Sequence, residues 1–112
     1  MTVTVKNLVP SVIAAASQTT QYTAVNVTTI IDKFTATNYS ASAATISVNL
    51  VTNGDTSGNQ NLIAKTKTLQ AGETYNFPTE LVGQVLNPGG FISTIAGTAA
   101  SINIRVSGRE VS

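Results

Sequence analysis

The sequence contains no cysteine, no histidine and no tryptophan, and it has only six Lys or Arg and five Asp or Glu among 112 residues. Without cysteine, disulfides and thiolate metal sites are excluded, and the redox compartment is left open. Without histidine or cysteine, Ser-His and Cys-His catalytic arrangements cannot form. We therefore expect a protein that is not an enzyme, with no cofactor, no metal and no small-molecule substrate.

The few carboxylates offer little to replace those groups. They are scattered along the chain at Asp32, Asp55, Glu73, Glu80 and Glu110. No spacing among them favours the acid/base pair of a glycosidase. The loop 53–60 places side-chain oxygens at alternate positions, but it has one carboxylate where a calcium loop gathers several. We interpret it as a polar hairpin loop.

Charge and hydropathy also exclude classes of partner. The net charge is +1, so no strong field attracts nucleic acid or an anionic membrane. No apolar run approaches the roughly 20 residues that span a bilayer. Lys65 and Lys67, expected on one strand face, could form a small basic patch with Lys33, but lysines on a solvated strand are the simpler interpretation. We expect neither a nucleic-acid nor a membrane partner.

The sequence does contain a strict two-residue alternation of apolar and polar residues. In 45–50 and again in 101–107, every second residue is a large aliphatic. Alternate residues of a strand point to one face of its sheet, so each set should be buried together. The predicted core therefore includes Ile46, Val48, Leu50, Ile102, Ile104 and Val106.

Turn signals recur every 8–12 residues and separate about eight short segments of this kind. The pattern predicts an all-β fold, either an antiparallel β-sandwich or a jelly-roll-like barrel. Pro78 allows at most one short helical turn near residues 78–85. The expected strands are 1–6, 11–16, 18–25, 27–38, 44–52, 62–69, 73–77, 91–96 and 100–106.

The longest expected strand, 27–38, has an ambiguous inner face. Ile30, Phe34 and Ala36 share one face, on which Asp32 is the awkward member. The opposite face, which begins with Ile31, is more polar. We therefore predict that the face with Ile30 and Phe34 is buried.

The first sixteen residues are treated apart from a single β-sandwich domain at 17–112. Pro10 makes a central strand unlikely for the whole stretch, because proline lacks a backbone donor. The segment 1–16 is either an edge strand of its own domain or an assembly arm that reaches a neighbouring subunit. Its apolar residues are too many for a solvated tail and are the candidate interface: Val3, Val5, Leu8, Val9, Val12 and Ile13.

Four segments carry a resemblance to a known group of proteins. They are 30–38 (IIDKFTATN), 69–75 (LQAGETY), 81–90 (LVGQVLNPGG) and 102–110 (INIRVSGRE). In order and spacing, from about Gln21 onward, the chain resembles small virion structural proteins of tailed bacteriophages. The nearest functional class in that group is the head decoration or cement proteins.

The resemblance implies a capsid decoration protein that binds the outside of the assembled head. Its partners would be the major capsid protein and further copies of itself, in a particle made in the bacterial host cytoplasm. Alternatives are a tail-fibre, head-fibre or baseplate component, or a non-catalytic carbohydrate-binding module. The last would need an exposed aromatic platform, for which Tyr22, Tyr39 and Tyr75 are the main candidates. The resemblance assigns no site residues.

Overall fold

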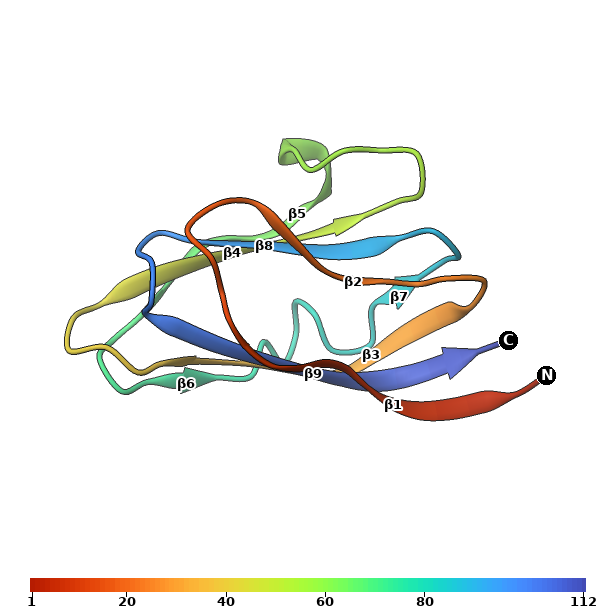
Figure 1. Ribbon diagram of the computed structural model, residues 1–112, viewed down its shortest axis with the longest axis horizontal. Helices are drawn as coiled ribbons and strands as arrows, with labels where there is room; N and C mark the ends of the chain where they lie inside the picture. Colours follow the sequence, from red (N-terminus) through yellow and green to blue (C-terminus); the bar gives the residue numbers. More distant parts are fainter.

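A computed structural model describes residues 1–112 as two antiparallel sheets packed face to face (Figure 1). The prediction of an all-β sandwich is confirmed, and the structure has nine strands. The strands are β1 (Val3–Ile13), β2 (Thr19–Thr23), β3 (Thr28–Asn38), β4 (Ala44–Val51), β5 (Leu62–Leu69), β6 (Thr74–Tyr75), β7 (Val85–Leu86), β8 (Phe91–Ala96) and β9 (Ile102–Val111).

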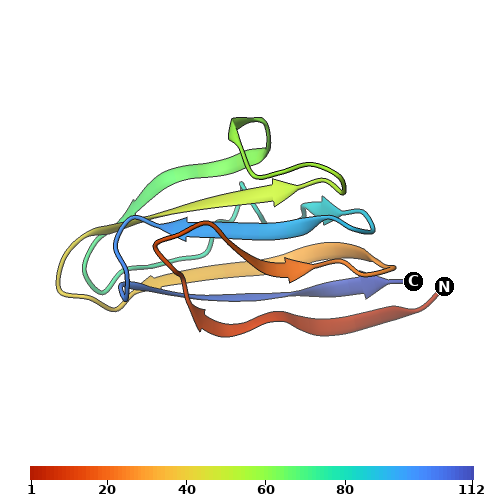
Figure 2. The ribbon, with the colours of Figure 1, turned by 45° about the horizontal axis from the view of Figure 1, so that its top comes forward.

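Sheet A has the order β1-β9-β3-β6, and β7 pairs with β3 on the same side as β6. Sheet B has the order β2-β8-β4-β5. The two ends of the chain lie together, because Thr2 and Ser112 exchange both backbone hydrogen bonds at 3.0 and 2.9 Å. Figure 2 shows β1 as the outermost strand beside β9.

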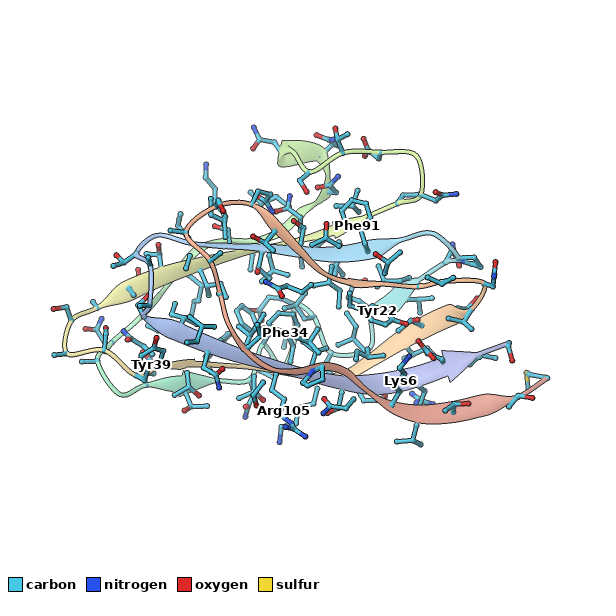
Figure 3. The ribbon with its side chains drawn as sticks, viewed as in Figure 1. Lys6, Tyr22, Phe34, Tyr39, Phe91 and Arg105 are labelled. Atoms are coloured by element: carbon cyan, nitrogen blue, oxygen red, sulfur yellow. The ribbon has the colours of Figure 1, made fainter.

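The core lies between the sheets and is centred on aromatic rings. Phe34 and Phe77 meet edge to face with centroids 5.3 Å apart, and Phe34 lies between the two layers (Figure 3). Leu50 is the one predicted core residue that is only partly buried. The five others are fully buried: Ile46, Val48, Ile102, Ile104 and Val106. The alternation therefore identified the inner faces of β4 and β9.

The predicted inner face of β3 is wrong in its first half, because the strand contains a β-bulge. Ile31 is opposite Gly108 and Lys33 is opposite Ser107, so Asp32 is an extra residue with no partner on β9. The extra residue reverses the alternation. Ile31 is buried in place of Ile30, whereas Phe34 and Ala36 are buried as predicted. Asp32 points to solvent.

A second bulge separates the two lysines of β5. Ile46 is opposite Lys67 and Val48 is opposite Ala64, so β5 has one residue more than β4 over this interval. Thr66 adopts a positive φ of 44° there. Lys67 Nζ lies over the Tyr75 ring, 4.4 Å from its centroid. Lys65 instead lines a hollow on the outside of sheet B. The two lysines do not form a patch on one face.

Residues 1–16 are continuous with the sandwich. The two strands expected on either side of Pro10 form one strand, whose pairing with β9 is irregular between Asn7 and Val12. After β1, Ala14 donates a backbone hydrogen bond to Ile102, and the Ala15 carbonyl accepts one from Ala96. The chain thus crosses from sheet A to sheet B. Of the two alternatives, the structure shows an edge strand paired within its own domain.

No helix forms at 78–85, where at most one short helical turn was expected. The only helical segment is a 3₁₀ turn, η1 (Asn59–Asn61), inside the polar loop. Residues 78–83 form hydrogen-bonded turns, in which the Leu81 amide donates to the Phe77 carbonyl at 3.4 Å. No helix in the protein has the length and hydropathy of a membrane span.

The bulge in β3 depends on the glycine opposite to it. A Cβ at position 108 would overlap the Ile30 carbonyl oxygen and lie 2.8 Å from Leu8 Cδ1. We predict that Gly108→Ala lowers the free energy of unfolding by about 1–3 kcal/mol, because the added methyl must displace backbone. Ser107→Ala, on the outer face of the same strand, should change it by about 0.5 kcal/mol or less. Urea unfolding measures both, and equal stability of the two variants would contradict this account of the bulge.

Candidate functional site

The six apolar residues of the N-terminal segment are divided between the core and the surface. Leu8 and Val9 are buried in the core. Val3 is 52% exposed and Val5 is 82% exposed. Val12 and Ile13, past the irregular stretch, are also exposed. The structure therefore leaves four of the predicted interface residues accessible on the edge strand of sheet A.

Val5 belongs to a row on the outer face of sheet A, in which Val5 and Val85 are exposed and Ile30 is half-buried. It is opposite Arg109 of β9, which is opposite Ile30 of β3, which is in turn opposite Val85 of β7. Residues opposite each other in antiparallel strands point to the same face. In the next row, Val3 is opposite Val111. We call the five apolar members the apolar patch: Val3, Val5, Ile30, Val85 and Val111.

The one charged side chain in this row is neutralised. Arg109 donates to both carboxylate oxygens of Asp32, with its shortest contact from Nη2 at 2.8 Å. Hydrogen bonding to the carboxylate, and then its charge, raise the pKa of Arg109 above its usual range. The bulge in β3 brings Asp32 to this face. The ion pair therefore lies among the apolar residues of the patch and adds no net charge to it.

Farther along the same face of sheet A, the side chains become polar and form a groove of about 390 Å³. It has no apolar lining residue, and its side chains come from alternate positions of β3 and β9 with one from β1. The groove is lined by Ser11, Lys33, Thr35, Thr37, Asn103, Arg105 and Ser107. We call it the polar groove. Arg105 projects from the outside of sheet A (Figure 3).

Two cations line the polar groove without a carboxylate. The two ion pairs of the chain join Lys6 to Glu110 and Arg109 to Asp32. Arg105 contacts neutral groups only. Its Nη1 is 3.4 Å from Ser11 Oγ, and with the Asn7 amide oriented to match its neighbours, Nη2 donates to it at 3.1 Å. The groove therefore presents positive charge that no ion pair within the domain neutralises.

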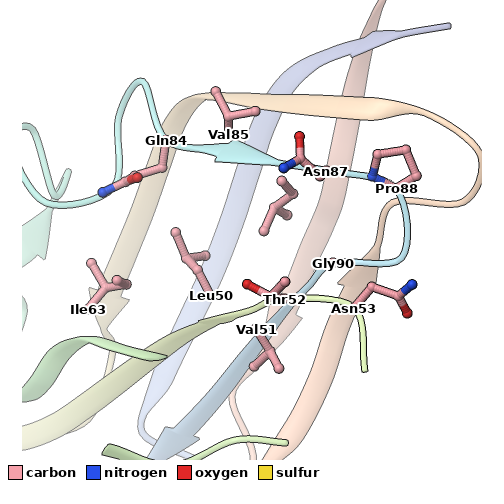
Figure 4. Close-up of a pocket in the computed structure, with 11 residues that line it drawn as sticks. Leu50, Val51, Thr52, Asn53, Ile63, Gln84, Val85, Asn87, Pro88 and Gly90 are labelled. Carbon is pink, nitrogen blue, oxygen red and sulfur yellow. The ribbon is translucent and has the colours of Figure 1, made fainter. Parts of the chain in front are cut away.

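A separate cleft of about 210 Å³ opens between the sheets beside β7 (Figure 4). Leu50 and Ile63 of sheet B form one side, and strand β7, with its buried Leu86, lies across from them. Because β7 has only two residues, sheet A covers this region incompletely, which explains why Leu50 is only partly buried. No titratable side chain lines the cleft, so its lining offers apolar contact and neutral hydrogen bonds.

At the end of the sandwich near the termini, a polar cluster joins both sheets. The Tyr22 hydroxyl of β2 donates to the Glu110 carboxylate and lies 2.6 Å from Thr29 Oγ1. Lys6 Nζ is 3.3 Å from the same carboxylate. Burial of the phenol, and then its hydrogen bond to Glu110, raise the pKa of Tyr22 to about 12. The cluster connects β1, β2, β3 and β9.

Glu73 and Glu80 accept hydrogen bonds from residues close to them in the sequence. Glu73 accepts from the Gln70 amide at 2.7 Å. Glu80 accepts from Tyr75 and Thr79, and the Thr79 hydrogen bond is the main reason that the pKa of Glu80 lies below its usual range. No three residues of the kinds that ligate metals lie together.

The polar loop 53–60 is closed by its own side chains. Asp55 accepts from the Thr56 amide at 2.8 Å and from Gln60 and Asn61. The Thr56 hydrogen bond is the largest of the effects that lower the pKa of this carboxyl. Asn49 of β4 donates to the Gly58 carbonyl and to Asn61 Oδ1. Of the alternating oxygens noted in the sequence, those of Asp55 thus close the loop on itself, and Asn49 holds it on sheet B.

The tyrosines do not gather into a platform. Tyr22 is buried, and Tyr75 packs edge to face on Phe77 beneath Lys67. Tyr39 is exposed but lies alone at the far end of the molecule (Figure 3). This arrangement offers no stacked aromatic surface of the kind that a carbohydrate-binding module requires.

The sequence reasoning missed the polar groove, although a signal for it was present. The polar positions Lys33, Thr35 and Thr37 alternate with the core residues of β3, and Asn103, Arg105 and Ser107 do the same in β9. The alternation by itself indicates only that these side chains lie on the outer face of each strand. That they form one groove follows from the pairing of β3 with β9, which the alternation does not specify.

In comparisons with known proteins, no family model, no curated protein and no solved structure matches this chain.

Titration of Tyr22 provides a test of the polar cluster. We expect the difference in ultraviolet absorbance between the wild type and Tyr22→Phe to titrate with a midpoint at about pH 12. Because the folded state disfavours the phenolate, the free energy of unfolding should fall as pH rises from about 10, the unfolded pKa, through the folded value. The fall should be shallower in Tyr22→Phe. A midpoint of this absorbance difference near pH 10 would contradict the burial and hydrogen bonding of Tyr22 in the cluster.

Proposed function

We propose that the protein is a non-catalytic structural component of a phage virion, specifically a decoration protein that binds the outside of the assembled head as a homo-oligomer. The observation that carries the proposal is an unprotected strand edge beside the apolar patch. The resemblance to small phage virion proteins supports the biological setting. The geometry supports the mode of assembly.

Three of the four sheet edges are protected against pairing with another chain. β2 has five residues with an irregular register, and β6 and β7 have two residues each. β5 carries a bulge and two lysines. Short strands, bulges and edge lysines are the usual means of preventing edge-to-edge association.

The fourth edge is different in its first half. From Val3 to Asn7, β1 pairs with β9 in unbroken register, and its other edge is free. The one lysine of this segment, Lys6, is held by Glu110 of β9 at 3.3 Å. Pro10 and the irregular pairing protect only the second half. A second copy could add its own Val3–Asn7 segment in antiparallel fashion and continue sheet A across a two-fold axis. The edge strand then performs the assembly role that the N-terminal residues were expected to have.

The apolar patch is continuous with this free edge and supplies a surface for the capsid. Its side chains are aliphatic and its one ion pair is internal, so contact with an apolar region of the capsid leaves no new charge unpaired. A weak contact between one patch and the capsid becomes strong when an oligomer repeats it over a lattice. A decoration protein also stabilises the particle, because it binds the assembled state.

The test uses heads of the parent phage prepared without this protein. The purified protein should saturate them at a fixed copy number per capsomer and raise the temperature of genome release. Val5→Lys should weaken head binding and self-association by about tenfold or more, since it places a charge in the patch.

The matched control is Val25→Lys, because Val25 is 67% exposed in the turn after β2 and lies outside the patch. It should bind as the wild type does. Binding to tails alone, or labelled copies that map to the tail tip of intact virions, would contradict decoration and favour a tail component. Equal loss of head binding in Val5→Lys and Val25→Lys would contradict the role proposed for the apolar patch.

A further inference from the structure

We infer that the polar groove of sheet A binds an extended acidic peptide segment of a partner protein, with carboxylates at alternate positions. This inference is independent of the proposed function, because the groove and the apolar patch are different parts of the same face. The argument rests on the unpaired cations, on their spacing and on the chemistry of the groove floor.

Lys33 and Arg105 provide positive charge that the domain itself does not neutralise. The nearest carboxylate in sequence, Asp32, is already occupied by the two-point contact with Arg109. The remaining lining residues are hydroxyl or amide side chains, so the groove presents donors and no competing anion. A carboxylate placed there gains charge-assisted hydrogen bonds, which are stronger than neutral ones.

The spacing of the cations fits an extended strand. Lys33 is opposite Ser107 and Arg105 is opposite Thr35, so the two cations are diagonal neighbours on adjacent strands. Such neighbours lie about 7–8 Å apart at their Cα atoms. Residues i and i+2 of an extended peptide point to one side and are about 6.6–6.8 Å apart. Two carboxylates at alternate positions can therefore reach both cations at once.

The floor of the groove favours a peptide over a sugar chain. No aromatic or other apolar side chain lines it, so a sugar ring would find no surface on which to stack. Hydroxyl and amide groups such as Thr35 and Asn103 can instead bond the polar backbone and side chains of a peptide. The groove is also open along sheet A, on the outside of the molecule, where a segment of a larger protein can reach it.

Binding is tested with a short labelled peptide of alternating glutamate and threonine and with its isomer in which the glutamates are grouped. The alternating peptide should bind more tightly, because neighbouring residues of a strand point to opposite sides. Lys33→Gln/Arg105→Gln should weaken binding by about tenfold or more. The charge-matched control Lys65→Gln/Lys67→Gln, on sheet B, should change it by less than about twofold.

Equal weakening in the two double variants would overturn the inference, since it would show that net charge alone attracts the peptide. Tighter binding of a sulfated oligosaccharide at Lys33 and Arg105 would also overturn it, in favour of a glycan site. Lys33, Arg105 and Lys65 are exposed, whereas Lys67 is half-buried over Tyr75. The melting temperatures of both double variants check that the fold is kept. Because both keep Val5 and the free edge of β1, peptide binding can fail while head binding persists.

Discussion

Strand β9 is paired with β1 on one edge and with β3 on the other, and this double pairing sets the geometry of sheet A. Because Gly108 has no side chain, β3 can approach β9 closely there and form the bulge that contains the extra residue Asp32. That single insertion turns Ile31 and Phe34 to the same side of the sheet although they are three residues apart. Without it, either Ile31 or Phe34 would leave the core.

The bulge also explains why the outside of sheet A has two chemically different parts. Before Asp32, the outward positions are mostly aliphatic, with Thr28 and the paired Arg109 as exceptions, and after it they are polar. Asp32 itself neutralises Arg109 at the boundary. An apolar patch beside a free strand edge and a cationic groove therefore share one face. Both candidate sites depend on the alignment of β3 with β9.

The sequence predicted the fold class and the inner faces of β4 and β9. In a regular strand, strict alternation of apolar and polar residues allows only one choice of buried face. The sequence predicted β8 to the residue because turn signals bound that segment at 87–90 and 97–100. It mispredicted Ile30, since the bulge depends on the pairing of β3 with Gly108 and Ser107 of β9, which are far away in the chain. β7 was missed because its two residues gain their structure only from pairing with β3.

The candidate site was predicted in part. The apolar character of residues 1–16 identified an accessible edge, but it could not separate Val5, which is exposed, from Leu8, which is buried. That division depends on which side of β1 faces sheet B. The polar groove was not predicted, since Lys33 and Arg105 come from distant segments and become neighbours only through strand pairing.

The most direct test of the central claim is the cross-strand contact pattern of β3 and β9 by nuclear magnetic resonance. The account predicts backbone contacts that pair Ile31 with Gly108 and Lys33 with Ser107, with no partner for Asp32. A regular ladder that pairs Asp32 with Ser107 and Lys33 with Val106 would contradict it. That result would turn Lys33 inward and remove it from the polar groove.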